Sequence, residues 1–327
     1  MLIYAITFVI IFLLMIVAVP FIARIAIKND FTDKPTERKK HKSPIPLSGG
    51  LTMFIVFVIG FVFFLLGINP FIDLELDPVL PAVLLGAALI VTVGLVDDYT
   101  KTKGKEFPVW PRLLVHFGAA VIAFAAGVRF TGFMNPFTDV YVYLPFWLQF
   151  VLTILWFVGL VTAFNFMDGL DGLCGLLALV SGVTFFIFAV YNNQPESAFL
   201  SVILVGIVAG FLRFNLPPAK IYMGDSGAYL LGYLLAAISL HGAFKQATVI
   251  NMIIPMLAMA IPIFDAMHVV VSRLIAGKPA HKADNTMYTH IHYRLLKNGL
   301  KPKPAVLIIF LLSVCLSLMS IILMLVF

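Results

Sequence analysis

The sequence predicts an all-α, polytopic membrane protein with about ten transmembrane helices in one domain over residues 1–327. Hydrophobic residues make up 61% of the 327 positions and charged residues only 12%, whereas soluble domains average about 45–50% and 25%. Ten apolar runs approach the roughly 20 residues that span a bilayer. They cover 2–27, 49–67, 79–96, 112–129, 146–164, 173–191, 198–213, 226–243, 248–275 and 304–326.

The first run and the two cysteines bear on processing. The stretch from Leu2 to Ala23 is longer than the roughly 15-residue core of a signal peptide, and no small-residue cleavage site is evident. We therefore expect a retained first helix. Cys174 and Cys315 both lie within apolar runs, so neither a disulfide framework nor a thiol metal site is predicted.

Basic residues are confined to alternate connections between the runs. Only Arg129 and Lys245 of the 22 Lys and Arg residues lie outside four connections, which are 24–48, 97–112, 213–225 and 273–303. By the positive-inside rule these connections face the cytoplasm, together with residues 165–172, and both termini lie outside. The same rule explains the formal net charge of +6, so no nucleic-acid partner is expected.

One polar stretch, from Asn165 to Leu173, lies between two long apolar runs. Asn165, Asp168 and Asp171 are spaced i, i+3, i+6, so a helix would present all three on roughly one face. Carboxylates at membrane depth are costly and usually bind a cation or serve transport. The alternative is a helix-end cap with solvated charges.

Further carboxylates end the third run and begin the eighth. Adjacent like charges at Asp97 and Asp98 repel, which favours a cation or a shared proton, with a solvated charge run as the alternative. Asp225 lies where a helix begins, so it could be an N-cap or present a carboxylate to a metal. No P-loop, Rossmann fingerprint or serine nucleophile elbow is present.

The first and last cytoplasmic connections carry the other polar clusters. The lysines of the first connection could attract anionic lipid, and the glycines that follow Pro46 open a helix whose exposed amides would favour an anion. The last connection could bind phosphate through histidines and arginine, whereas its spacing matches no zinc signature. Asp265 and His268 could support this connection or pair with each other. The cluster itself consists of His281, Asp284, His290, His292, Tyr293 and Arg294.

Acidic residues and phosphate-binding cations on one predicted face indicate a magnesium–diphosphate site. Magnesium is typically held by one or two carboxylates, water and substrate phosphate oxygens. A membrane enzyme that moves a phosphorylated group onto a lipid would need these groups. A secondary transporter would instead place broken helices and ion sites near the bilayer midplane, and the sequence shows no internal repeat.

Six motifs follow one another along almost the whole chain. They are Asp33-x-Pro35-x-x-Arg38-x-x-His41 with Pro46 to Gly50; Gly94-Leu-Val-Asp97-Asp98; Asn165-Phe-Met-Asp168-Gly-Leu-Asp171-Gly; Asn215 to Pro217 with Met223-Gly-Asp225-Ser-Gly; Pro262-Ile-Phe-Asp265; and His290-Ile-His292. In this order they resemble the polyprenyl-phosphate N-acetylhexosamine-1-phosphate transferases. The resemblance is to the branch that uses undecaprenyl phosphate and N-acetylglucosamine and starts wall teichoic acid, O-antigen and related glycans.

The resemblance implies a reaction and its partners. A UDP-N-acetylhexosamine, with UDP-N-acetylglucosamine as the first candidate, would give its sugar-1-phosphate to undecaprenyl phosphate and release UMP. The cofactor would be Mg²⁺, for which Mn²⁺ could substitute. The resemblance also places the protein as a catalytic domain among the lipids of the bacterial plasma membrane. Apolar outer helix faces allow a homodimer without requiring one.

The resemblance also assigns roles residue by residue. Asp225 matches the metal-binding aspartate, and Asp97, Asp98 and Asp168 match the catalytic carboxylates. The remaining matches are substrate-binding positions, namely Arg38, His41, Lys105, Asn165, Asp171, His290, His292 and Arg294.

The chain departs from the family pattern at two places. Tyr293 stands where many members have histidine, and the extended 97–112 connection leaves the phosphate-contacting lysine open between Lys105 and a position near Arg112. The alternatives are a phospho-N-acetylmuramoyl-pentapeptide transferase, a secondary transporter and an inactive scaffold. For the chemistry we favour direct attack by the lipid phosphate, with a covalent aspartyl intermediate as the alternative.

Overall fold

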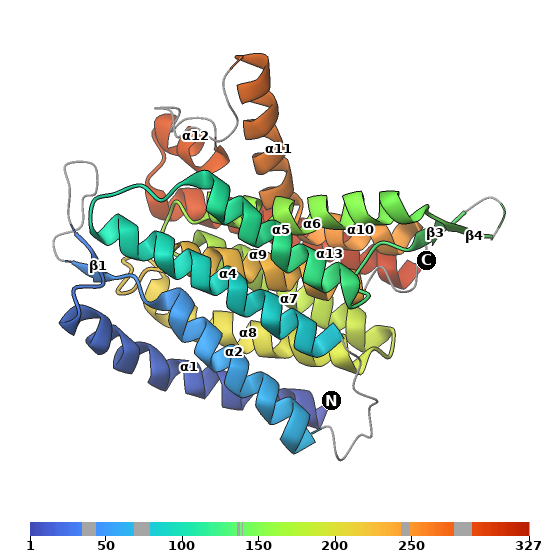
Figure 1. Cartoon of the computed structure of the whole chain (residues 1–327), viewed down its shortest axis with the longest axis horizontal. Helices are drawn as coiled ribbons and strands as arrows, with labels where there is room; N and C mark the ends of the chain where they lie inside the picture. The colour runs from blue at the N-terminus through green and yellow to red at the C-terminus, as the bar shows by residue number, and fades with distance from the viewer. Residues whose placement is uncertain are drawn as a thin grey trace.

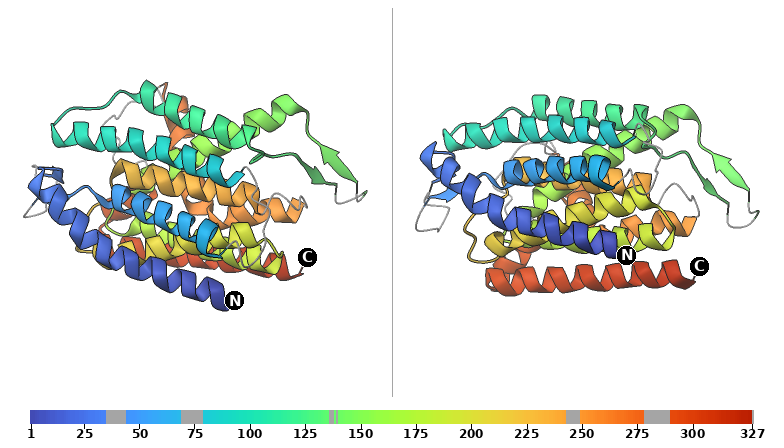
Figure 2. Two further views of the ribbon diagram at one scale, coloured as in Figure 1. Left: turned by 60° about the horizontal axis from the view of Figure 1, so that its bottom comes forward. Right: turned by 90° about the horizontal axis from the view of Figure 1, so that it is seen from below.

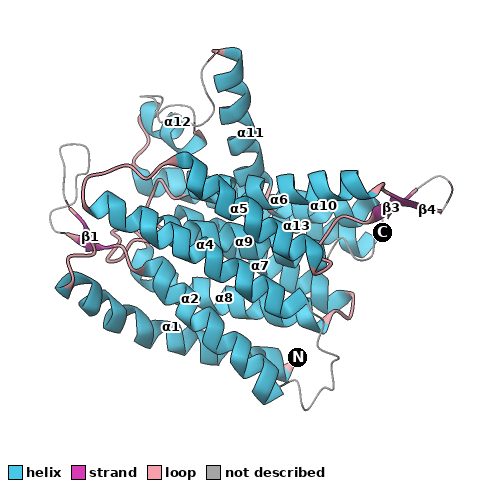
Figure 3. Cartoon of the chain, in the orientation of Figure 1, coloured by secondary structure: helices cyan, strands magenta, loops and turns pink. Residues whose placement is uncertain are grey.

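The computed structural model describes residues 1–34, 44–68, 79–135, 138, 140–242, 249–277 and 290–326. Within them the chain is a bundle of helices with two small two-stranded sheets, as Figure 3 shows. The elements in order are α1 (Leu2–Lys28), β1 (Thr32–Asp33), β2 (Ile45–Pro46), α2 (Gly49–Phe63), the π-helical turn η1 (Phe64–Ile68), α4 (Val79–Thr102), α5 (Val109–Ala125), β3 (Gly132–Met134), β4 (Tyr141–Tyr143), α6 (Phe146–Met167), α7 (Leu173–Tyr191), α8 (Pro195–Asn215), α9 (Gly224–His241), α10 (Val249–Ala258), α11 (Ala260–Ile275), α12 (Ile291–Lys297) and α13 (Pro302–Val326).

The predicted all-α class is confirmed, whereas the count of ten membrane spans is not. Among the described residues seven helices are long and apolar enough to cross a membrane. An eighth span results if α10 and α11, which are bent by 79° at their junction, count as one. The other two predicted runs are also helices, but α5 has only 17 residues. The second, α9, has Asp225 in its first turn and ends with His241, which dilutes its apolar character.

Helix α9 is the centre of the bundle. Every residue of α9 except Asp225 is buried, because α2, α4, α6, α7 and α8 pack around it. By contrast, α1 and α13 lie at the periphery of the bundle (Figure 2), and only 22% and 28% of their apolar spans are buried. Apolar side chains on such outer faces are the expected contact with lipid tails. Asp225 is therefore the one residue of α9 that is partly exposed.

The two ends of the bundle differ in what they carry. The last residues of α4 and the first residues of α9 lie at one end, and both chain termini lie at the other (Figure 1). The antiparallel pair β1–β2 joins Thr32–Asp33 to Ile45–Pro46 beside α4. Strands β3 and β4 form an antiparallel pair between α5 and α6. Helix α11 leaves the bundle at a steep angle (Figure 1).

Candidate active site

Asp98 fixes the start of α9. Its Oδ1 accepts a hydrogen bond from the backbone N–H of Asp225 (2.7 Å), and its Oδ2 accepts from the N–H (3.1 Å) and the hydroxyl (2.6 Å) of Ser226. A carboxylate at a helix N-terminus satisfies unpaired amides and favours the helix dipole. Gly224 has φ +70°, and a Cβ there would lie 2.5 Å from Asp98 Oδ2. Glycine therefore lets the chain reach this carboxylate.

Asp97, the neighbouring carboxylate, faces different partners. Its Oδ2 accepts hydrogen bonds from Arg112 Nη1 (2.9 Å) and from the Tyr229 hydroxyl (3.3 Å). Its Oδ1 is buried and accepts no hydrogen bond from the described residues, and the Lys101 ammonium lies 3.9 Å away. A buried carboxylate oxygen without a partner is costly. This oxygen is therefore available as a ligand for a cation.

Asp225 joins three helices. It forms an ion pair with Lys101 of α4, and its Oδ1 accepts a hydrogen bond from Asn165 Nδ2 of α6 (3.1 Å). The Lys101 side chain is about half exposed, so this ion pair lies at the edge of the site. The predicted clustering of residues from separate motifs is thus observed for Asn165, Asp97 and Asp225.

Asp168 lies just beyond the end of α6, where its backbone N–H donates to the Asn165 carbonyl (3.2 Å). Burial, with the nearby negative charges of Asp225 and Asp98, raises the pKa of its carboxyl well above the usual range. A bound cation would remove this penalty on the ionised form. The described residues include no preformed group of three His, Cys, Asp or Glu side chains that could hold a metal. Magnesium does not need one, because substrate phosphates and water complete its shell.

Asp171 holds a loop rather than facing the other acids. Its Oδ2 accepts a hydrogen bond from the Ala219 N–H (2.9 Å). Asn215 bridges the same two segments, since its Oδ1 accepts from the Gly172 N–H (3.1 Å) and its Nδ2 donates to the Ile221 carbonyl (2.8 Å). These contacts fix the turn after Asp168 against the loop that leads into α9.

The prediction of an anion site at the start of α2 is wrong. The N–H groups of Gly49 and Gly50 donate to the carbonyls of Tyr222 (3.1 Å) and Met223 (2.9 Å). These amides are therefore occupied. A Cβ on Gly50 would lie 2.2 Å from the N atom of Gly227. The two glycines allow the backbone of α2 to touch the start of α9. The sequence alone does not separate this close packing from anion binding as the reason for the glycines.

Helix α12 closes over the turn that contains Gly169. Asp265 of α11 accepts from the Ile291 N–H (2.6 Å) and pairs with His290 Nδ1 (2.7 Å), so of the two predicted alternatives it supports this segment. The His290 ring lies 5.0 Å from the ring of Phe166, which follows Asn165. The Arg294 guanidinium lies on the exposed side, 3.4 Å from His268 Nε2.

His292 lies fully buried beneath this segment. A Cβ on Gly169 would come within 2.3 Å of its Nε2. Burial and the neighbouring His290 lower the pKa of His292 to about 4, so its ring is neutral at pH 7. Neither ring nitrogen has a hydrogen-bond partner among the described residues, so His292 packs beneath this segment as a neutral ring and not as a cation.

One predicted substrate residue, Lys105, is not brought to the acidic cluster. It is exposed in the connection after α4, and Arg112 of α5 makes the contact with Asp97 instead. Of the two positions left open by the sequence, the structure thus places the one near Arg112 at the site. Four further predicted positions lie outside the described residues, namely Arg38, His41, His281 and Asp284.

Sequence reasoning missed Tyr229 at this site. Its hydroxyl contacts Asp97, Asp225 and Arg112. The available signal was its position four residues after Asp225, which places both side chains on one helix face.

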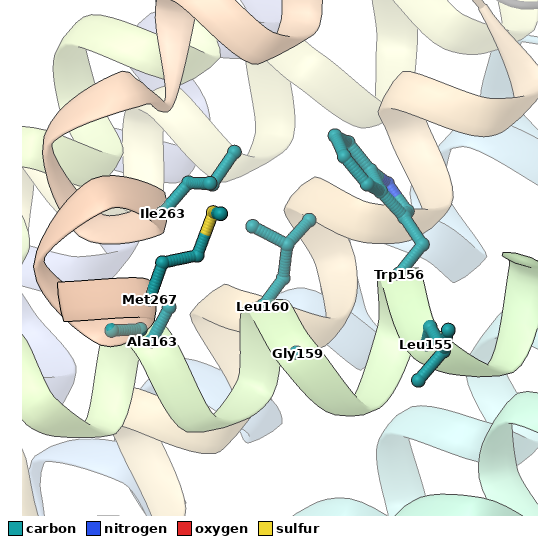
Figure 4. Close-up of a pocket in the computed structure, with 8 residues that line it drawn as sticks. Leu155, Trp156, Gly159, Leu160, Ala163, Ile263 and Met267 are labelled. Carbon is teal, nitrogen blue, oxygen red and sulfur yellow. The ribbon is translucent and has the colours of Figure 1, made fainter. Parts of the chain in front are cut away.

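An apolar groove lies between α6 and α11 (Figure 4). Its volume is about 190 Å³, and its lining is almost entirely apolar. The lining residues are Leu155, Trp156, Gly159, Leu160, Ala163, Ile263, Ala266 and Met267. Ala163 precedes Asn165 by two positions, so the groove and the polar cluster share helix α6.

An acidic cluster with two cations, at one end of an apolar helical bundle, is the arrangement expected of a membrane enzyme that handles phosphorylated groups. The chain belongs to glycosyl transferase family 4, whose family model matches residues 80–243. That segment runs from α4 to α9 and includes six of the polar positions singled out above, Asp97, Asp98, Asn165, Asp168, Asp171 and Asp225.

Individual relatives agree with the family. The chain is 32% identical to the probable undecaprenyl-phosphate N-acetylglucosaminyl 1-phosphate transferase of Bacillus subtilis, over 97% of this chain and 84% of the relative. It is 32% identical to the decaprenyl-phosphate N-acetylglucosaminephosphotransferase of Mycobacterium tuberculosis, over 85% and 72%. It is 30% identical to a phospho-N-acetylmuramoyl-pentapeptide-transferase of Listeria monocytogenes, over 72% and 74%. The chain is therefore a sugar-1-phosphate transferase and a multi-pass bacterial membrane protein.

Proposed function

We propose that the protein transfers N-acetylglucosamine-1-phosphate from UDP-N-acetylglucosamine to undecaprenyl phosphate. The product would start a cell-wall or surface glycan such as teichoic acid or the O-antigen of lipopolysaccharide. The observation that carries the proposal is the convergence of Asp97, Asn165 and Asp225 from three helices, next to Lys101 and Arg112. The first two relatives described above support this donor and this class of acceptor.

Mg²⁺, or Mn²⁺ in its place, is the proposed cofactor. Asp225 would hold it, and the open oxygen of Asp97 and the crowded carboxyl of Asp168 lie at the same end of the bundle. When bound, the ion would neutralise negative charge on the diphosphate and on the leaving UMP.

The chemistry requires little from a general base. A phosphomonoester has a second pKa near 6, so the lipid phosphate is largely dianionic at about pH 7. One of its oxygens attacks the β-phosphorus of the donor, a new P–O bond forms, and the bond to the oxygen that leads to the α-phosphate breaks. UMP leaves with that oxygen and its electron pair.

The protein side chains position the reacting groups. Arg112, fixed by Asp97, presents a planar guanidinium of the kind that pairs with phosphate oxygens. Lys101 is exposed enough to exchange its contact with Asp225 for one with a substrate phosphate. Asp98 holds the first turn of α9 and thereby the position of Asp225.

The lining of the groove between α6 and α11 supports a lipid acceptor. Apolar side chains along Leu155, Leu160 and Met267 would receive an isoprenoid chain, and burial of apolar surface contributes about 25 cal/mol per Å². The groove shares α6 with Asn165, and a lipid lying along this helix would bring its phosphate to the end of the bundle that carries the carboxylates.

The test is UMP release by purified protein in lipid nanodiscs. UDP-N-acetylglucosamine is supplied with and without undecaprenyl phosphate, and with Mg²⁺ or with EDTA. We expect release only when lipid and Mg²⁺ are both present.

Two further donors define the specificity. UDP-N-acetylgalactosamine and UDP-N-acetylmuramoyl-pentapeptide are offered under the same conditions. Faster release from the pentapeptide donor would replace the proposal with the activity named for the Listeria relative. Absence of release from every donor by folded protein would contradict a transferase function.

A further inference from the structure

A buried tyrosine connects the two halves of the acidic cluster. Tyr229 lies on α9, one turn after Asp225, and is only 3% exposed. Its hydroxyl lies 3.3 Å from Asp97 Oδ2 and 3.5 Å from Asp225 Oδ2. Arg112 Nη1 lies 3.5 Å from the same hydroxyl. The Tyr229 hydroxyl thus contacts both carboxylates and the Arg112 guanidinium.

The roles of these atoms follow from their donor inventory. A guanidinium only donates and a carboxylate only accepts, whereas a phenol does both. The Tyr229 oxygen can therefore accept from Arg112 while its single proton is shared between Asp97 and Asp225. This sharing links the orientation of the guanidinium to the separation of the two carboxylates.

The ring of Tyr229 is held independently of its hydroxyl. His116 of α5 packs against it edge to face, with 4.7 Å between ring centroids. His116 is 4% exposed, and neither ring nitrogen has a hydrogen-bond partner among the described residues. Its contact with the tyrosine is therefore one of packing. A phenylalanine at position 229 would keep this contact and lose only the hydroxyl.

We propose that Tyr229 is a positioning residue, which sets the orientation of Arg112 and the spacing of Asp97 and Asp225 for phosphoryl transfer. The inference rests on the proposed function. Tyr229 is too buried to touch substrate, so it acts through these three neighbours. Its loss should misplace groups that act in the transition state and leave substrate binding nearly intact.

The chain offers a matched control on the same helix. Tyr233 is fully buried one turn further along α9, and its hydroxyl has no hydrogen-bond partner among the described residues. Tyr229→Phe and Tyr233→Phe therefore remove the same atom from buried positions of one helix, with and without contact to the site.

The experiment compares UMP release by the wild type, Tyr229→Phe and Tyr233→Phe over a range of lipid and UDP-N-acetylglucosamine concentrations, up to saturation. We expect kcat of Tyr229→Phe to fall about tenfold, less than the roughly 100-fold or greater loss on removal of a group that contacts the transition state directly. KM for both substrates should stay within about twofold. Tyr233→Phe should keep the wild-type kcat.

A double-mutant cycle with Arg112→Lys separates positioning from general destabilisation. If Tyr229 acts through Arg112, the combined loss in kcat is smaller than the product of the single losses. Three results would overturn this inference and leave the proposed function standing: a combined loss in kcat equal to the product of the single losses, an unchanged kcat for Tyr229→Phe, or an equal loss in kcat for Tyr233→Phe. A wild-type protein that releases no UMP would overturn the proposed function and this inference with it.

Discussion

The two ends of α9 both carry buried polar side chains, but they satisfy them differently. At the C-terminal end His241 lies between Glu196 (3.3 Å) and Ser197 (2.9 Å), so a basic side chain meets an acid and a hydroxyl. At the N-terminal end Asp97, Asp98 and Asp225 crowd together, and one oxygen of Asp97 has no hydrogen bond from the described residues.

The difference separates a structural cluster from a functional one. Opposite charges at helix ends stabilise the ends themselves, because the dipole favours an acid at the start of α8 and a histidine at the end of α9. Like charges held together at the N-terminal end of α9 lower stability unless cations join them. Lys101 and Arg112 supply two cations there, yet one oxygen of Asp97 still accepts no hydrogen bond from the described residues.

The largest effect is expected for Asp225→Asn. The change removes the carboxylate proposed to hold Mg²⁺, so UMP release should fall below detection. It also breaks the ion pair with Lys101 while it relieves like-charge repulsion with Asp98, so Tm should fall only slightly and the protein should still fold. Near-normal turnover would contradict the assignment of Asp225 as metal ligand.

Asp97→Asn and Asp98→Asn should differ in stability although both lose activity, by about 100-fold or more. In Asp98→Asn an NH₂ group replaces one of the two oxygens that accept from the N–H groups at the start of α9. The N–H group left without an acceptor should lower the free energy of unfolding by about 1–3 kcal/mol and so lower Tm. Asp97→Asn leaves those N–H groups satisfied and should keep Tm. Equal Tm values in a thermal scan of the two variants would refute this division of roles.

A moderate effect is expected for Asp265→Asn. The change weakens the contacts that dock His290 and the start of α12 over the Asn165 turn. KM for UDP-N-acetylglucosamine should rise about tenfold with kcat nearly unchanged, as for an interaction made equally in ground and transition states. Steady-state kinetics measure this directly, and an unchanged KM would place the substrate away from α12.

The smallest effect on turnover is expected for Glu196→Gln at the opposite end of α9. The pair with His241 should lose part of its charge interaction, so Tm should fall slightly while kcat and KM stay within about twofold. A large loss of turnover would show that the two ends are coupled through α9.

The sequence predicted which residues meet better than what each one does. Order and spacing of the motifs were enough to bring Asp97, Asn165 and Asp225 together. Asp97 and Asp98 are adjacent in the chain, yet one faces the site and the other caps α9, because successive helical residues point about 100° apart. That division depends on the rotation of α4 against α9, which only the packed bundle fixes.

Other errors have equally local causes. Glycines at 49 and 50 suit both anion binding and close helix contact, and only the position of Tyr222 separates these alternatives. The count of ten spans is not confirmed where α5 is short, where α9 is polar at both ends and where α11 turns away from α10. Arg112 could be named only as one of two positions, because the path of residues 103–108 is not set by periodicity.

The most direct test of the central claim is a count of bound divalent ions. Mn²⁺ is titrated into protein in nanodiscs with UDP-N-acetylglucosamine, and the EPR signal of free Mn²⁺ reports binding. Wild type and Glu196→Gln should each bind one ion tightly, and Asp225→Asn should not. Equal binding by all three proteins would show that the carboxylates at the start of α9 are not the metal site.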